Sequence, residues 1–152
     1  MHENITLNIL LADDDKDDRQ FFSMALDGIS IATKLESVVD GEKLMDYLSE
    51  NMHQLPDVIF LDLNMPRKNG FECLSEIKLN QKLNQLQVVI FSTSFEQEVV
   101  NLLYHNGAKY YIRKPSGFLQ FKKIINHTVS LIAQKKSSKT NREDFVLTMQ
   151  GS

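Results

Sequence analysis

The hydrophobic residues of this chain fall into five short runs, and each run is followed by polar residues. The runs occupy residues 5–12, 31–39, 58–61, 88–91 and 110–113. The third and fourth contain only apolar side chains, which is typical of strands buried on both faces of a parallel sheet. The second is less uniformly apolar, which favours a place at the edge of the sheet. The pattern therefore predicts five strands.

Between these runs, apolar residues recur at the spacing of a helix with one buried face. This spacing predicts helices from about residue 15 to 28, 41 to 51, 71 to 80, 96 to 106 and 117 to 134. Strands that alternate with helices predict an α/β domain, a doubly wound five-stranded parallel sheet with helices on both faces. Right-handed crossovers then bring the C-terminal ends of all strands to one edge.

Length and composition bound the domain organisation. With 152 residues, 42% of them hydrophobic, the chain suffices for one domain with a core and is too short for two ordinary domains. From residue 135 the composition becomes basic and polar, which predicts a flexible tail over 135–152. Phe145, Val146 and Leu147 could dock on the domain or on a partner, but a disordered end is favoured. We expect one domain at 5–134 and a tail too short to form an output domain.

Charge and cysteine content exclude several classes of function. The net charge is −3 and no basic stripe precedes the tail, so a nucleic-acid surface is not expected. The single cysteine, Cys73, excludes an internal disulfide and a thiolate metal cluster, which suits a reducing compartment. The N-terminus lacks a secretory signal, and no apolar run approaches the ~18 residues of a membrane span. We expect a cytoplasmic protein that acts away from membranes.

Polar residues follow four of the strands at the edge where open α/β sheets bind ligands. They are Asp13 and Asp14 after the first strand, Asp62 after the third, Ser92 and Thr93 after the fourth, and Lys114 after the fifth. Carboxylates placed together attract a hard divalent cation, and Mg²⁺ suits such oxygen ligands. A lysine and a hydroxyl opposite the ion would hold a transferred phosphoryl group, and a carboxylate can be the nucleophile. The edge therefore predicts phosphoryl chemistry.

In their order and placement these residues resemble the receiver domain of two-component response regulators. The resemblance runs from about residue 5 to 134 and rests on Asp13-Asp14, the loop from Asp62 through Asn64 and Pro66 to Gly70, Ser92, Gly107-Ala108, Tyr111 and Lys114-Pro115. It implies a flavodoxin-like fold with strand order 2-1-3-4-5. It also implies a stand-alone, chemotaxis-regulator-like protein of a phosphorelay. Such a protein accepts its phosphoryl group from a sensor histidine kinase or a phosphotransfer protein, catalyses its own phosphorylation and dephosphorylation, and acts on a downstream protein target.

The resemblance assigns roles to the acidic residues. Asp62 would accept the phosphoryl group in a Mg²⁺-dependent reaction. Asp14 and Asp62 would ligate Mg²⁺ through their side chains, and Asn64 would do so through its backbone carbonyl. Asp13 would act through water or by placing the ion.

The resemblance also assigns the switch. Lys114 would pair with Asp62 and then contact a phosphoryl oxygen, and its bond to Pro115 would be cis. Ser92 would turn toward the phosphoryl group and let Tyr111 swing inward. That movement would remodel the face formed by the helix at 96–106, the strand at 110–113 and the last helix, where a homodimer is also expected.

Several alternatives stay open beside this interpretation. The spacing to the lysine selects Ser92, but a shift of one residue would select Thr93, and Tyr111 could simply pack in the core. The run Asp13 to Asp18 could be an ordinary solvated helix start; as a calcium loop it fails, because Asp18 stands where glycine is required. A receiver fold could bind partners without phosphorylation. A phosphatase would need a second carboxylate at the position of Asn64, and a flavin phosphate would need donors where the first strand ends in acids.

Overall fold

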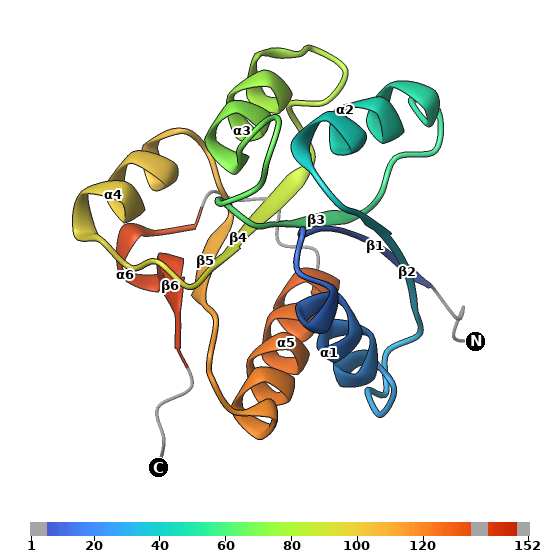
Figure 1. Ribbon diagram of the computed structural model, residues 1–152, viewed down its shortest axis with the longest axis vertical. Helices are drawn as coiled ribbons and strands as arrows, with labels where there is room; N and C mark the ends of the chain where they lie inside the picture. The colour runs from blue at the N-terminus through green and yellow to red at the C-terminus, as the bar shows by residue number, and fades with distance from the viewer. Residues whose placement is uncertain (1–5, 135–139, 149–152) are drawn as a thin grey trace.

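The computed structural model describes residues 6–134 and 140–148, and within them a parallel sheet lies between two layers of helices (Figure 1). The strands are β1 Leu7–Ala12, β2 Thr33–Val38, β3 Val58–Leu61, β4 Gln87–Ser92, β5 Tyr110–Arg113 and β6 Val146–Leu147. The helices are α1 Lys16–Leu26, α2 Gly41–Glu50, α3 Gly70–Leu79, α4 Gln97–His105, α5 Phe118–Ala133 and α6 Arg142–Phe145. No helix within these two ranges has the length and apolar character needed to cross a bilayer.

The strand order of the sheet is β2-β1-β3-β4-β5-β6, with every neighbouring pair parallel. The first five strands therefore confirm the predicted flavodoxin-like order. Every position of β3 is buried, whereas every position of β2 is exposed or half-buried, as expected for an edge strand. The chain passes to opposite sides of β1 to form β2 and β3. A crevice at the C-terminal ends of β1 and β3 follows from this reversal.

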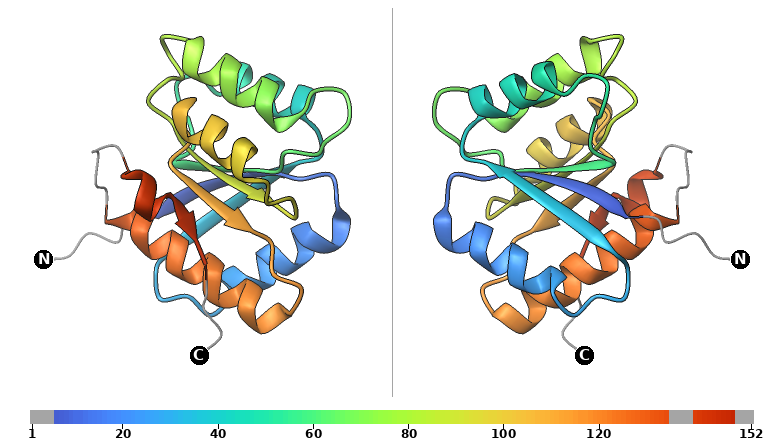
Figure 2. Two further views of the ribbon diagram at one scale, coloured as in Figure 1. Left: turned by 90° about the vertical axis from the view of Figure 1, so that its left-hand side faces the viewer. Right: turned by 90° about the vertical axis from the view of Figure 1, so that its right-hand side faces the viewer.

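Two hydrophobic cores lie on the two faces of the sheet because alternate strand residues point in opposite directions. Leu10 and Ile59 pack on the face covered by α2, α3 and α4. Ile9 and Phe60 pack on the other face, which α1 and α5 cover (Figures 1 and 2). With both faces covered, the sheet is a rigid platform whose strand ends carry the polar residues.

Two glycines let the helices approach the loop that follows β3. A Cβ atom on Gly70 would lie 2.5 Å from the backbone oxygen of Asp62, and one on Gly41 would overlap the backbone oxygen of Lys68. The N-terminus of α3 is further fixed by a capping box between Asn69 and Glu72. The loop from β3 to α3 is thus held from both sides, and its first residue, Asp62, has a defined position.

The C-terminal segment differs from the expected flexible tail. Residues 142–147 form α6 and β6, and β6 pairs with β5 as a sixth strand, so the five-strand prediction is incomplete. The Phe145 side chain is fully buried, because β5 offers an open edge and the space beside α4 accepts an aromatic ring. Residues 135–139 and 149–152 of the predicted tail lie outside the described residues, as does Ile5 of the first predicted strand.

Candidate functional site

Three carboxylates meet at the C-terminal edge of the sheet, as the sequence predicted. Asp13 and Asp14 follow β1 and Asp62 follows β3, and one carboxylate oxygen from each lies within 4.8 Å of the others. Asp13 and Asp62 are 0% and 6% exposed, whereas Asp14 is exposed. Two of the three carboxylates are therefore buried and the third faces solvent, and we call this group the acidic pocket. Hard oxygen donors of this kind suit Mg²⁺ or a similar divalent cation.

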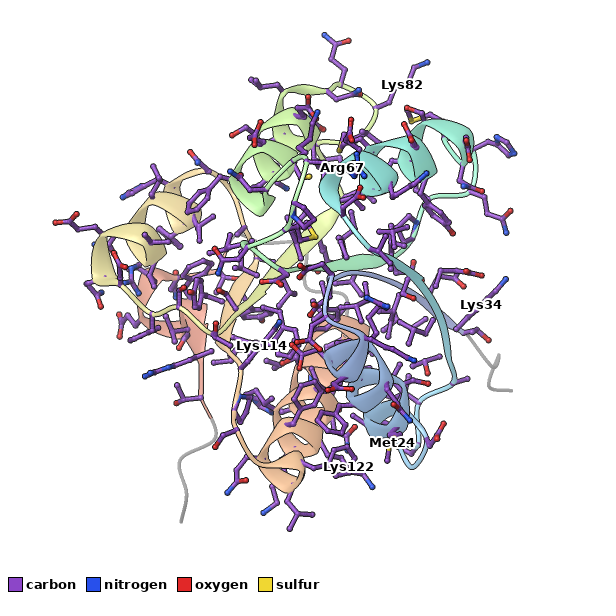
Figure 3. The ribbon with its side chains drawn as sticks, in the orientation of Figure 1. Met24, Lys34, Arg67, Lys82, Lys114 and Lys122 are labelled. Atoms are coloured by element: carbon purple, nitrogen blue, oxygen red, sulfur yellow. The ribbon has the colours of Figure 1, made fainter. Side chains whose placement is uncertain are left out.

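Lys114 places a positive charge beside these acids. Its Nζ atom lies 2.9 Å from Oδ2 of Asp13, 2.8 Å from Oδ2 of Asp18 and 3.5 Å from Oδ2 of Asp62. The lysine side chain is 6% exposed, and Figure 3 shows it beside the first turn of α1. Its backbone N–H donates to the carbonyl of Ser92, which joins the ends of β4 and β5. The structure thus brings Lys114 to the acids, although it lies far from them in the sequence.

Asp18 also belongs to this cluster, although the sequence pattern predicted it only as part of a helix start. The side chain of Asp15 caps α1 by accepting from the N–H groups of Asp17 and Asp18. This cap fixes the first turn of α1, and Asp18 then accepts a hydrogen bond from Lys114. A helix that begins directly after the acidic strand end keeps its first turn near the same edge. This short connection between strand and helix is the feature of the sequence from which the position of Asp18 could have been predicted.

Burial and charge together set the ionisation of the pocket. Burial raises the pKa of Asp62 to about 6, although the charge of Lys114 opposes the shift. Burial also raises the pKa of Asp13, again against the influence of Lys114. Burial alone would lower the pKa of Lys114, but its hydrogen bonds to Asp18 and Asp13 outweigh burial and raise it. The lysine is therefore charged at neutral pH, and its ammonium faces three acidic side chains, those of Asp13, Asp18 and Asp62.

The hydroxyl at the end of β4 belongs to Ser92, which is buried, whereas Thr93 is exposed. The Ser92 Oγ atom accepts from the N–H of Ser94 at 3.2 Å. Tyr111 is fully buried, and its hydroxyl donates to the carbonyl of Ser94. Burial raises the pKa of Tyr111, and a hydrogen bond with Ser92 opposes the rise. Ser92, rather than Thr93, is linked to the aromatic ring, and that ring is already turned inward.

The loop after Asp62 is held by local contacts. The N–H of Asn64 lies 3.3 Å from Oδ1 of Asp62. Arg67 adopts a left-handed conformation with φ of 69°, and its Nε atom lies 3.4 Å from Oδ2 of Asp40, the cap of α2. Nothing in the sequence signalled this conformation, which is uncommon for arginine.

The Lys114–Pro115 bond departs from the expectation. In the described part of the chain no peptide bond is cis, so the predicted cis bond at this position is wrong. The trans isomer is the ordinary preference of an X–Pro bond. From a trans bond the lysine side chain already reaches its carboxylate partners, so the geometry of the pocket does not require the cis form.

Residues 9–126 match the family model described as response regulator receiver domain. A probable methanogenesis regulatory protein, FilR2 of Methanothrix harundinacea, is 30% identical over 122 residues, or 77% of each chain. Response regulator Rcp1 of Synechocystis is 33% identical over 122 residues, which cover 77% of this chain and 82% of Rcp1.

Two solved structures extend the likeness to the whole fold. The phosphorylated cyanobacterial phytochrome response regulator RcpA superposes with a TM-score of 0.80 at 30% identity, over 87% of this chain and 97% of RcpA. The Mn²⁺-bound form of Rcp1 superposes with a TM-score of 0.78 at 29% identity, over 89% of this chain and 99% of Rcp1.

Proposed function

The chain belongs to the response regulator receiver domain family, and we propose that it is a phosphorylation switch that carries its phosphoryl group on Asp62. Phosphorylation-based switching is the general role of this family, and the chain is homologous to regulators such as Rcp1. The observation that supports the assignment to Asp62 most directly is the 3.5 Å approach of Lys114 to this buried carboxylate, beside Asp13 and Asp14. This arrangement provides a nucleophile, oxygen ligands and a cation in one pocket.

A divalent cation fits the donor set of the pocket. Asp13, Asp14 and Asp62 supply carboxylate oxygens within reach of one ion, and Asn64 is the proposed source of a backbone carbonyl. The pocket holds three carboxylates and the neighbouring Asp18 against a single lysine, so it favours a further cation. Mn²⁺ occupies the related Rcp1, which supports a divalent site, and we assign Mg²⁺ to this chain. When bound, Mg²⁺ would neutralise charge on the phosphoryl oxygens.

The side chains then have separate roles in the transfer. An Asp62 oxygen would attack the phosphorus of a phosphohistidine on a sensor kinase or phosphotransfer protein. The new P–O bond would form as the P–N bond to histidine breaks. Lys114 lies where it would donate to an oxygen of the transferred group, and Asp13 and Asp18 orient its ammonium. The product would be an acyl phosphate, and its hydrolysis by water would return Asp62 to the free carboxylate and end the signal.

The output of the switch would pass through β4 and β5. Ser92 would turn toward the phosphoryl group, and its link to Tyr111 would carry the change to the surface formed by α4 and β5 together with β6, which covers the edge of β5. A downstream protein in the cytoplasm would bind that surface. A homodimer through α4, β5 and α5 stays a prediction, and it would have to include β6, which covers the edge of β5.

Incubation with Mg²⁺ and a small phosphodonor tests the proposal by intact mass. We expect a gain of one phosphoryl group that is lost with a chelator and in Asp62→Asn. Asp17→Asn is the matched control, because Asp17 is exposed and lies in the acidic run from Asp13 to Asp18 without taking part in the pocket. A chain that gains no phosphoryl group with Mg²⁺ would contradict the proposal and favour a receiver fold that binds partners without phosphorylation.

A further inference from the structure

The face between α4 and β5 is closed by the chain's own C-terminal segment, residues 142–147. Phe145 is fully buried there. Its ring centroid lies 5.2 Å from that of Tyr104 on α4, in an edge-to-face arrangement, and 6.5 Å from that of Tyr111 on β5. Aromatic pairs at such distances stabilise one another beyond the burial of their surface. Phe145 is therefore part of the core beneath α4.

Two further contacts hold the segment in place. β6 runs beside β5, with Val146 opposite Tyr111 and Leu147 opposite Ile112 (Figures 1 and 2). At the start of the segment, Nε of Arg142 donates to Oδ1 of Asn101 on α4 at 2.8 Å. The segment is thus joined to both elements of the face, by a strand pairing on one side and a side-chain hydrogen bond on the other.

Tyr111 connects this segment to the phosphoacceptor pocket. Its hydroxyl donates to the carbonyl of Ser94, and the N–H of Ser94 donates to the hydroxyl of Ser92. The same ring packs against Phe95, with 6.0 Å between centroids, as well as against Phe145. Movement of Tyr111 out of the core would therefore leave Phe145 without one of its neighbours. Close-packed interiors resist such a void.

We propose that residues 142–147 are a positioning element of the switch, in which Phe145 holds Tyr111 inward and so favours the conformation that binds a phosphoryl group on Asp62. This inference rests on the proposed function. If docking of the segment and phosphorylation favour the same conformation, each must strengthen the other by the same factor. The surface that a partner meets beside α4 then consists of α6 and β6 rather than the bare edge of β5.

The test measures both directions of this coupling. In the presence of Mg²⁺, affinity for beryllium fluoride, a stable phosphoryl mimic, is compared between the parent chain and Phe145→Ala. Couplings between sites commonly amount to about fivefold or more, and we expect Phe145→Ala to weaken binding of the mimic by at least about that factor. Conversely, the mimic should slow amide hydrogen exchange in residues 142–147 of the parent chain.

Matched variants separate this role from a general loss of packing. Glu143→Ala changes an exposed residue of the same short helix and should keep the parent affinity. Leu48→Ala opens the same core at its other end, under α2, which lies far along the sheet from β5 and α6 (Figure 1), and should also keep it. Phe145→Leu should recover part of the affinity, and it replaces Phe145→Ala if circular dichroism shows that the alanine variant is unfolded.

The outcomes distinguish this inference from the proposed function. Parent-like affinity in a folded Phe145 variant whose exchange shows the segment released would overturn the inference and leave the proposed function intact. A parent chain that binds no mimic and gains no phosphoryl group on Asp62 would overturn both.

Discussion

Replacing Asp62 with asparagine is expected to stabilise the folded chain at neutral pH when no divalent cation is present. Burial raises the pKa of Asp62 from its usual 3.8 to about 6, so the folded chain holds this proton more tightly than the unfolded chain does. Each unit of difference between the folded and unfolded pKa is worth about 1.4 kcal/mol, so ionisation of this carboxylate lowers the free energy of unfolding by about 3 kcal/mol. Asparagine keeps an oxygen that can accept from the N–H of Asn64 and carries no charge.

The dependence on pH has a defined sign. Because the folded pKa is raised, stability is lost as pH rises from about 3.8 to about 6, and the full cost is present above about pH 7. The advantage of Asp62→Asn should therefore be about 3 kcal/mol at pH 7.5 and less than about 1 kcal/mol at pH 4. Lys114 retains its hydrogen bonds to Asp13 and Asp18 in the variant, so its charge stays paired.

Urea unfolding at the two pH values, in buffer with a chelator, measures these differences. Asp17→Asn serves as the control, because it removes a charge from an exposed position and should show little difference between the two pH values. Added Mg²⁺ should stabilise the parent chain far more than Asp62→Asn, since the variant lacks one of the carboxylates. Equal stability of parent and Asp62→Asn at pH 7.5 without cation would refute the conclusion that the buried, ionised Asp62 destabilises the folded chain.

Three further predictions concern the neighbours of Asp62. Asp18→Asn weakens a charge-assisted hydrogen bond of Lys114, so phosphorylation by a small phosphodonor, followed by intact mass over time, should slow by roughly threefold to tenfold. An unchanged rate would show that Asp18 does not help to orient the lysine. Gly70→Ala should cost about 1–3 kcal/mol in urea unfolding because its Cβ meets backbone, whereas Gly28→Ala, which faces a flexible lysine end, should cost far less; equal costs would count against a tight loop. Ser92→Ala should reduce the shift of the Tyr111 ring signals in NMR spectra when beryllium fluoride binds, and Thr93→Ala should leave it; the reverse result would reassign the hydroxyl.

Much of the fold could be predicted because its signals are local. The all-apolar runs at 58–61 and 88–91 are buried strands, and the mixed run at 31–39 contains the edge strand β2. The site could be predicted for a related reason. Parallel strands deliver their C-terminal residues to one edge, so Asp13, Asp62 and Lys114 had to lie near one another once the strands were placed.

The features that escaped prediction depend on tertiary contacts. Residues 146–147 form a strand of two residues after a polar stretch, too short for a periodic signal, and they are ordered by the open edge of β5. Asp18 pairs with Lys114, but in the sequence it cannot be told from an ordinary acidic residue at a helix start. Arg67 takes a left-handed conformation that could not be predicted from its residue type. It lies within a loop fixed by Asp40 and by close packing around Gly70.

The residue that carries the phosphoryl group is the decisive observation for a switch based on Asp62. After reaction with a small phosphodonor and Mg²⁺, reduction with borohydride converts an aspartyl phosphate to homoserine, and tandem mass spectrometry can then identify the altered residue. We expect homoserine at position 62 and an unmodified chain when Mg²⁺ is removed. Homoserine at Asp13 or Asp14, or an unaltered Asp62 in a chain that has gained a phosphoryl group, would contradict it.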